Sequence, residues 1–400
     1  MSLLAEVVRQ HGSAYLKRYG GAVLPSHVHA LNRISVCRTA ALGGHLAHCE
    51  SCDEQHLLYH SCRHRACPQC GTLRTTQWIE RQRELLLPAR YFHVVFTLPS
   101  ELRDVVRSNQ KALLPVLFRA AYESLAEICQ DPHYLGADLI GALAVLHTWT
   151  RTLEWHPHVH MLVPGGGLGA DGETWVTAPR RKKRYLVPVG ALSKKFRGRF
   201  MALARKTLPK GQMPSVPAKK QWITFAKPVV QGANQVLEYL GRYVHKTAIG
   251  NHAVVAFDDR TVTFRYTDSR THRRKQMTLP ANEFLRRFLQ HVPPKGFHRV
   301  RCFGLLHPRY RGKLRRLQLL LGKPRQLQEA QSPAIECDQP ARSRCPSCGV
   351  EALIIVRTLD AAECRAWSTN MKTLLDITRP GLATARAPPR VQISKPARIA

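Results

Sequence analysis

Three histidines alternate in the short segment HPHVH at residues 156–160. The apolar residues after Pro157 favour a β-strand, and Pro164 with the glycine triplet behind it ends that strand. Side chains two residues apart in a strand point to the same face, so His158 and His160 present two imidazoles side by side. Imidazole is a ligand of divalent transition metals. The segment therefore predicts a metal site, and unconnected surface histidines are the alternative.

The segments around these histidines predict an α+β fold with an antiparallel sheet and flanking helices. Strand, helix, strand, strand is the opening of a ferredoxin-like sheet. The last two strands are joined by a short polar segment and should pair as a hairpin. Apolar patterning places these elements at residues 91–98 (strand), 109–130 (helix), 139–149 (strand) and 157–163 (strand).

A third metal ligand can come from the strand that pairs with the HVH strand. His147 lies in the earlier strand of the expected hairpin, where it can face His158 and His160. His156 is the competing choice and ranks second, because Pro157 turns it away. The sequence therefore favours His147, His158 and His160 as the metal-binding set.

Four cysteines form two Cys-x2-Cys pairs, Cys49 with Cys52 and Cys67 with Cys70. A short spacer separates the pairs, as in zinc ribbons and knuckles. Thiols stay reduced inside cells, so disulfides are not expected, and free thiols are the alternative. Zinc contributes about 10–16 kcal/mol to the folding of modules too small for a core of their own. These cysteines therefore predict a structural Zn²⁺ site, although two more cysteines lie in the same stretch.

The charge balance indicates a polyanionic partner. The chain has 61 Lys and Arg against 27 Asp and Glu, a net charge of +34 over 400 residues. Such an excess is typical of proteins that bind nucleic acid. No run of about 18 apolar residues exists and the N-terminus lacks a signal-peptide profile, so we expect no membrane association and a cytoplasmic location. The basic run at residues 180–184, with Arg181 and Lys182, is either a phosphate-binding groove or a solvated face.

A helix with two tyrosines on one face is expected from the segment QGANQVLEYLGRYVHK. At about 100° per residue, Gln235, Tyr239 and Tyr243 repeat every four positions along that face. Tyrosines so placed are more often packing residues than catalysts. A metal site elsewhere in the chain, together with the basic neighbours Arg242 and Lys246, favours a catalytic role.

Together these motifs resemble the HUH single-strand endonucleases, named for the pattern histidine, apolar residue, histidine. With the cysteine module in front, the chain more closely resembles the rolling-circle insertion-sequence transposases of the IS91 type. The resemblance covers residues 31–250, and Thr150-Arg151 departs from the Gly-Gln of that family. It is carried by the segments CRTAALGGHLAHCESC, SCRHRACPQC, LHTWTRTLEWHPHVHMLVPGGG and EYLGRYVHKTAIGN.

The resemblance implies an enzyme that nicks and joins single-stranded DNA at transposon ends and target sites, through a covalent 5′-phosphotyrosine and a free 3′-OH. Tyr239 and Tyr243 are then the nucleophiles, and Arg242 and Lys246 contact the DNA. A free tyrosine has a pKa near 10 and is a poor nucleophile at neutral pH. The resemblance therefore also implies a divalent ion, Mg²⁺ or Mn²⁺, held by the three histidines, with Gln235 as a spare ligand.

Five regions are expected along the chain. Near the C-terminus, Cys345 and Cys348 with Cys337 and Cys364 form a candidate second zinc knuckle. The alternatives to a transposase are a rolling-circle replication initiator or relaxase with the same chemistry, and a non-enzymatic zinc-ribbon DNA-binding regulator. The regions are residues 1–85 (first helix and zinc-binding module), 86–270 (HUH nuclease core), 271–335 (basic helical DNA-binding segment), 336–368 (second knuckle) and 369–400 (disordered tail).

Overall fold

The computed structural model describes residues 2–70, 72–177, 186–217, 220–229, 233–244, 248–268, 270–322 and 343–377. The chain forms two compact units, each built from two separate stretches of sequence. The first unit contains Met1–Cys37 and Ser61–Glu336, and the second contains Arg38–His60 and Cys337–Ala400. The sequence placed residues 1–85 and 336–368 in separate regions, whereas the second unit combines part of each.

The first unit contains a seven-stranded antiparallel sheet. Its strands are β3 (Tyr91–Thr97), β4 (Leu139–Trp149), β5 (Trp155–Pro164), β6 (Gly166–Leu168), β7 (Trp175–Thr177), β8 (Thr224–Pro228) and β12 (Val300–Gly304). Their order is β7-β6-β4-β5-β3-β8, and β12 also pairs with β4. β4 and β5 form the expected hairpin. Along its other edge, β4 pairs with β6 at Leu139 and Ile140 and then with β12.

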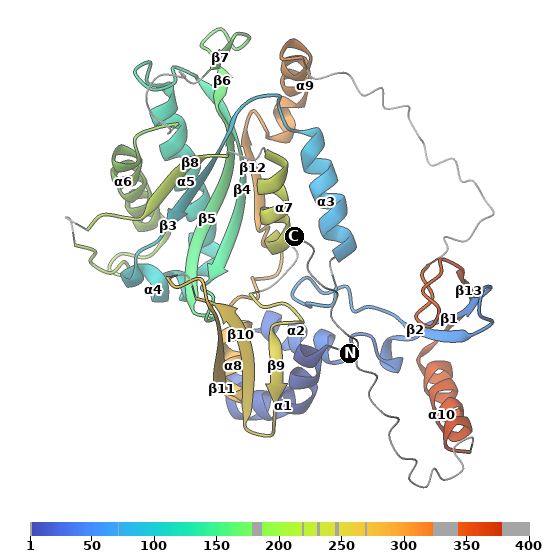
Figure 1. Cartoon of the computed structure of the whole chain (residues 1–400). Coiled ribbons are helices and arrows are strands. Elements are labelled where there is room, and N and C mark those ends of the chain that lie inside the picture. The colour runs from blue at the N-terminus through green and yellow to red at the C-terminus, as the bar shows by residue number, and fades with distance from the viewer. Residues whose placement is uncertain are drawn as a thin grey trace, which may run out of the picture. The chain divides into compact units, whose positions relative to one another are not determined.

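Helices cover both faces of this sheet (Figure 1), which confirms the predicted α+β class. The elements are α3 (Thr72–Glu84), α5 (Gln110–Gln130), α6 (Val189–Thr207), α7 (Ala233–Val244) and α9 (Arg311–Leu320). One face packs with α5 and α6 and buries Val94 and Val159. The other face packs with α3, α7 and α9 and buries Leu162. Side chains alternate along a strand, so His158 and His160 lie on the α7 side while Val159 enters the opposite core.

The first unit also contains a smaller sheet next to the N-terminal helix. The elements outside the large sheet and its covering helices are α1 (Leu3–Tyr19), α2 (Pro25–Ser35), α4 (Arg103–Ser108), α8 (Ala281–Leu289), β9 (Val254–Phe257), β10 (Thr261–Thr267) and β11 (Arg274–Pro280). β10 pairs with both β9 and β11, and α1 contacts β9 and α8.

Residues 271–335 differ from the basic helical segment that the sequence predicted. β11 belongs to the smaller sheet and β12 to the large one, so both extend sheets begun before residue 271. Val300 and Phe303 favour a β-strand, but they lie among basic residues such as Arg299 and Arg301. The basic character of the segment therefore led to the wrong prediction. The helices α8 and α9 occupy only part of this stretch.

The second unit is a three-stranded antiparallel sheet with one helix. Its elements are β1 (Gly44–Cys49), β2 (Gln55–Tyr59), β13 (Leu353–Leu359) and α10 (Ala361–Ile377). β1 is the middle strand, and its pairing with β13 runs from Gly44 opposite Leu359 to Cys49 opposite Leu353. α10 continues past residue 369, where the sequence predicted a disordered tail, and residues 378–400 lie outside the described residues.

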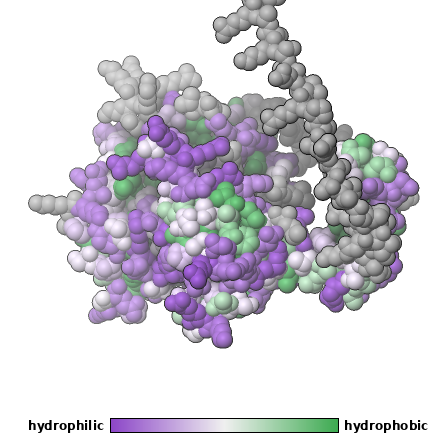
Figure 2. Space-filling model, turned by 60° about the horizontal axis from the view of Figure 1, so that its bottom comes forward, coloured by the Kyte–Doolittle hydropathy of each residue, from purple (hydrophilic) through white to green (hydrophobic). Residues whose placement is uncertain are grey.

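No helix in the described ranges is both long and apolar enough to cross a bilayer. Hydrophilic side chains cover most of the surface seen in Figure 2, around a smaller apolar area. This agrees with the charged composition of the chain.

Four short 3-10 helices complete the described elements: η1 (Gly20–Ala22), η2 (Ala40–Leu42), η3 (Ser100–Leu102) and η4 (Pro308–Tyr310).

Candidate active site and cysteine clusters

Three histidines of the β4–β5 hairpin converge on one point. One ring nitrogen each from His147, His158 and His160 lies within 4.8 Å of the other two. The imidazole centroids of His147 and His160 are 4.2 Å apart, and those of His158 and His160 are 4.9 Å apart. The hairpin register pairs His147 with His158, and strand alternation adds His160 on the same face. This three-histidine group can hold one metal ion.

Hydrogen bonds orient two of these rings. Nδ1–H of His158 donates to the carbonyl oxygen of His156 at 2.7 Å, which leaves Nε2 of His158 with its lone pair. Nδ1 of His160 lies 2.8 Å from Nε2 of His93. Nε2 of His160 is buried without a hydrogen-bond partner in the described part of the chain. A buried ring nitrogen on a ring held through its other nitrogen fits a metal ligand.

Burial keeps these imidazoles neutral. Desolvation lowers the pKa of His147 and of His160 well below the ordinary value of 6.5, and neighbouring basic groups lower it further. Desolvation also lowers the pKa of His158, to about 4. A neutral imidazole keeps its lone pair, so the three rings can bind a cation at neutral pH without first releasing protons.

His93 is a part of this site that the sequence analysis missed. It lies in β3, next to β5, and its ring stacks on that of His160 with centroids 5.0 Å apart. Burial lowers the pKa of His93 to about 4. The available signal was a single histidine in an apolar strand, alternating with Val94 and Phe96, which enter the opposite core. Its contact with His160 fixes the direction of that ring.

We expect His93→Ala to weaken metal binding at the three-histidine group by about 10–100-fold, because outer partners of histidine ligands have effects of this size. The measurement is a calorimetric titration with Mn²⁺. His133→Ala is the matched control, because it removes an imidazole that is 89% exposed and outside the site. If His93→Ala bound Mn²⁺ as tightly as this control, the role assigned to His93 would be wrong.

His156, the competing third ligand, has a different partner. Its Nδ1 accepts a hydrogen bond from Nη2 of Arg103 at 2.9 Å. Burial, and then the charge of Arg103, lowers the pKa of His156. The structure thus brings His147, and not His156, together with His158 and His160.

Helix α7 places Tyr239 beside the histidines. The Tyr239 ring centroid lies 6.0 Å from that of His160 and 6.2 Å from that of His93. The side chain is 39% exposed, so a ligand from solvent can reach it. The structure therefore brings one of the two predicted nucleophiles to the predicted metal site.

The other predicted site residues of this region are described only in part. Gln235 is exposed near the start of α7. Tyr243 and Arg242 belong to α7, but their side chains lie outside the described part of the structure. The remaining predicted DNA contacts that lie outside the described residues are Arg181, Lys182 and Lys246.

The position of Tyr239 depends on how α7 packs. Leu237 and Leu240 are fully buried in the core on the histidine side of the sheet. Gly241 touches α3, and a Cβ built at this glycine would lie 2.6 Å from Cδ1 of Ile79. A larger residue at this position would force the Ile79 side chain to move, so glycine suits this close contact between the two helices. Residue 239 is thereby turned to the edge of the packed face, within reach of both the histidines and solvent.

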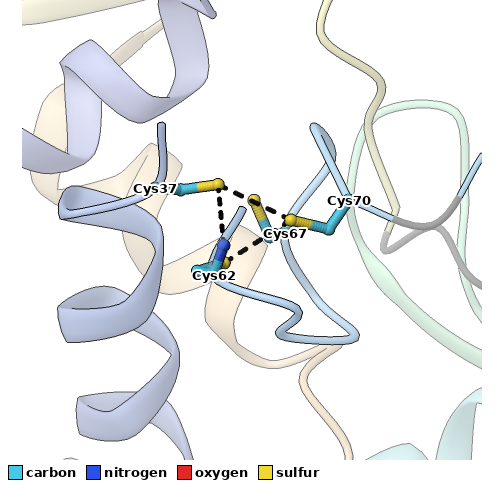
Figure 3. A group of neighbouring side chains, drawn as sticks. All are labelled: Cys37, Cys62, Cys67 and Cys70. Carbon is cyan, nitrogen blue, oxygen red and sulfur yellow. Dashed lines mark hydrogen bonds between the residues drawn. The ribbon is translucent and has the colours of Figure 1, made fainter. Parts of the chain in front are cut away.

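Four cysteines of the first unit, Cys37, Cys62, Cys67 and Cys70, point toward one another (Figure 3). Their sulfur atoms lie within 4.8 Å of one another, with Cys70 Sγ 3.5 Å from Cys37 Sγ and 3.6 Å from Cys62 Sγ. Hydrogen bonding with Cys62 and Cys67 lowers the pKa of Cys37 below the ordinary value of a thiol. Four convergent thiolates are a ligand set of structural Zn²⁺.

This cluster corrects the predicted zinc ligands, because Cys49 and Cys52 do not join Cys67 and Cys70. The β1–β2 hairpin carries Cys49 and Cys52 into the second unit, while Cys67 and Cys70 stay in the first. Spacing could not show this, because both pairs have the same Cys-x2-Cys form. The sulfurs that complete the first cluster come from two cysteines outside such pairs.

The C-terminal cysteines also differ from the predicted knuckle. Cys345 and Cys348 meet the early pair, Cys49 and Cys52, in the second unit. Cys364 is not a member of that group, and its thiol donates a hydrogen bond to the carbonyl oxygen of Leu359, five residues earlier, at 3.9 Å. Cys337, the other expected partner, lies outside the described residues.

Comparison with known proteins places the chain among the transposases that carry a zinc-binding domain. Residues 7–98 match the family described as transposase zinc-binding domain, and residues 141–313 match the family described as putative transposase. The chain belongs to the IS91 family of transposases. No solved structure matches it.

Two known transposases align with this chain over most of their own length. The chain is 38% identical over 396 residues to the putative transposase y4qJ of Sinorhizobium fredii, across 92% of this chain and 98% of that protein. It is 31% identical over 324 residues to the transposase for insertion sequence element IS801 of Pseudomonas savastanoi pv. phaseolicola, across 75% of each.

The family makes the chain a DNA-processing enzyme and sets aside the non-enzymatic regulator. The match over residues 141–313 contains the three-histidine group and α7. The match over residues 7–98 contains the Cys37, Cys62, Cys67 and Cys70 cluster. The zinc-binding domain and the clusters together support Zn²⁺ as a structural metal.

Proposed function

We propose that this transposase cuts and rejoins single-stranded DNA at the ends of its insertion element, in rolling-circle transposition, with Tyr239 as the nucleophile. The observation that supports this most directly is the position of Tyr239, whose ring centroid lies 6.0 Å from that of His160 at the edge of the three-histidine group. Phosphodiester transfer needs a nucleophile and a charge-stabilising site within reach of one phosphate.

In the proposed reaction, Tyr239 is the only protein group that forms a covalent bond to the DNA in the first step. The Tyr239 hydroxyl oxygen attacks the scissile phosphorus, and the bond from phosphorus to the 3′-oxygen breaks. The 5′-phosphate stays on Tyr239 as an ester, the phenol proton passes to solvent, and the 3′-oxygen takes up a proton to leave as a hydroxyl. The ester keeps the energy of the broken bond, so a 3′-OH can attack it and rejoin DNA without a nucleotide cofactor.

The three histidines fit a divalent cation, Mg²⁺ or Mn²⁺. His160 offers a buried ring nitrogen with no hydrogen-bond partner among the described residues, and the bond of His158 to a backbone carbonyl presents its other nitrogen. His147 faces both from the paired strand. Nitrogen donors favour Mn²⁺, because Mg²⁺ prefers oxygen. When bound, such a cation polarises the scissile phosphate and stabilises the leaving oxygen.

Tyr243 has a second nucleophilic role in this proposal. It follows Tyr239 by about one helical turn on the same helix. One tyrosine can hold a cut end while the other attacks the next strand. Basic side chains then neutralise the phosphates around the cut. The basic residues proposed for this are Arg242, Lys246, Arg181 and Lys182.

An exposed aromatic side chain favours single-stranded substrate. Phe225, on the edge strand β8, is 36% exposed, and its ring centroid lies 6.0 Å from that of His93. Nζ of Lys227 lies 5.0 Å from the same ring. An aromatic ring next to a basic side chain can stack an unpaired base while the cation contacts the backbone. A base inside a duplex is not available for such stacking.

The test is covalent capture with the wild-type protein. Single-stranded oligonucleotides that tile the DNA on both sides of the gene are labelled at one end and incubated with protein and Mn²⁺. With the 3′ label, we expect a labelled protein–DNA adduct that survives SDS. With the 5′ label, we expect a released fragment that ends in a 3′-OH.

Duplexes of the same sequences, and reactions with EDTA, are the controls and should give no adduct. The absence of an adduct across the whole tile with every divalent cation tried would contradict the proposal. An adduct that carries the 5′ label would mean that the tyrosine is joined to a 3′-phosphate, which is the opposite polarity to the one proposed. Cleavage at a replication origin rather than at element ends would favour the replication initiator.

A further inference from the structure

Four cysteines converge in the second unit from two distant parts of the chain. The sulfur atoms of Cys49, Cys52, Cys345 and Cys348 lie within 4.8 Å of one another. Cys49 Sγ is 3.7 Å from Cys348 Sγ, and Cys52 Sγ is 3.7 Å from Cys345 Sγ, across separations of 299 and 293 residues. Each Cys-x2-Cys pair therefore faces the other, and all four sulfurs form one compact group.

Both pairs sit in the same kind of tight turn. The N–H of Asp53 donates to the Cys49 carbonyl oxygen at 2.9 Å, and the N–H of Gly349 donates to the Cys345 carbonyl oxygen at 2.9 Å. Asp53 and Gly349 close the turns with φ values of +62° and +76°. The N–H of Ser347 also donates to Cys345 Sγ at 3.4 Å. Such a turn aims both sulfurs to one side and supplies backbone N–H groups to a thiolate, as in zinc knuckles.

Apolar packing in the described part of this unit is small. Two residues of the packed cluster are themselves cysteines of the four-sulfur group. On β13, Ile355 and Val356 are 52% and 60% exposed and add little to the core. A core of this size needs another source of stability, and a bound metal is the usual one in small modules. The buried cluster consists of Ala47, Cys49, Cys345, Ala352 and Leu353.

We propose that Cys49, Cys52, Cys345 and Cys348 bind one Zn²⁺, which joins the β1–β2 hairpin to β13 as a zinc ribbon split between the two ends of the chain. The match to the zinc-binding family ends at residue 98, so that domain contains only half of these ligands. The C-terminal segment thus completes an N-terminal zinc site. His56 supports the group from outside, with Nε2 3.2 Å from Cys345 Sγ. This inference does not depend on nuclease activity.

The first test is the zinc content of the full-length protein, measured by atomic emission. Relative to the wild-type chain, we expect Cys345→Ser/Cys348→Ser to lose one ion per chain, because the Cys37, Cys62, Cys67 and Cys70 cluster is a separate site. The matched control Cys302→Ser, which removes a thiol outside both clusters, should lose none. Zinc at the three-histidine group would add equally to all three proteins. An unchanged zinc content in the double variant would overturn the proposal.

A second test uses only the wild-type protein, so it does not depend on how a variant folds. Cysteine alkylation is mapped by mass spectrometry while a chelator withdraws zinc. We expect Cys49, Cys52, Cys345 and Cys348 to become reactive together, and the amides of β13 to lose hydrogen-exchange protection at the same chelator concentration, while β4 and β5 keep theirs. If the C-terminal pair is fully reactive before chelation and the early pair is not, no shared site exists.

Discussion

Replacing Tyr239 with phenylalanine is expected to abolish the covalent protein–DNA adduct, with a fall in nicking rate of at least about 10⁴-fold, because it removes the attacking atom. Phenylalanine lacks only the hydroxyl group. Its ring can keep the same position beside His160 and His93, where the centroids are 6.0 Å and 6.2 Å away. The side chain is partly exposed, so we expect the fold and DNA binding to be retained. The measurement is adduct formation with the 3′-labelled oligonucleotide, alongside binding by fluorescence anisotropy.

Tyr243→Phe is the matched control, because it makes the same chemical change about one turn along α7. We expect it to form the first adduct at the wild-type rate and to lose the later strand-transfer step. If only Tyr243→Phe lost the adduct, Tyr243 would be the first nucleophile and Tyr239 the second. An adduct in both single variants, and in the double variant as well, would exclude tyrosine as the nucleophile.

The histidine pair and its hairpin could be predicted because both follow from local rules. Strand alternation places His158 and His160 on one face in any fold that keeps the strand. The short connection after residue 149 restricts the register, so His147 had few possible partners on the next strand. The structure has β4 at residues 139–149, as predicted, and pairs His147 with His158.

Pairings between distant segments could not be predicted in the same way. Three Cys-x2-Cys pairs of one form occur in the chain, and which of them converge depends on the pairing of β1 with β13. No local pattern encodes that pairing. His93 was missed for a related reason, because its importance comes from the neighbouring strand β5 and not from its own surroundings in the sequence.

The same limit applies to the position of Tyr239. Helical spacing predicted α7 but not the face of the sheet that it covers. Leu237 and Leu240 decide this by entering the core that contains Leu162, and Gly241 allows the close approach to Ile79. The sequence does not show which side chain lies opposite a glycine in a helix, so the role of Gly241 in packing could not be predicted. Packing of this kind therefore brings the tyrosine to the histidines.

His158→Ala is expected to lower metal-dependent cleavage on the order of 10³-fold while DNA binding changes little. A cation bound by His147, His158 and His160 would contribute several kcal/mol to stabilising charge on the reacting phosphate, and each 1.36 kcal/mol is a factor of ten in rate. Loss of one of the three imidazoles would remove most of this contribution, because the two that remain would bind a cation only weakly. The measurement is the cleavage rate as a function of Mn²⁺ concentration, with DNA binding followed separately. Cleavage at the wild-type rate would show that the metal assignment is wrong.

His156→Ala is the matched control for this change. It removes an imidazole from the same strand, two residues earlier, whose Nδ1 is bonded to Arg103 rather than to the other histidines. The backbone carbonyl of residue 156, which accepts the hydrogen bond from His158, remains in the variant. A general weakening of β5 would lower cleavage in both variants, whereas loss of a metal ligand lowers it in His158→Ala alone. If His156→Ala lost cleavage while His158→Ala kept it, His156 rather than His158 would be the metal ligand.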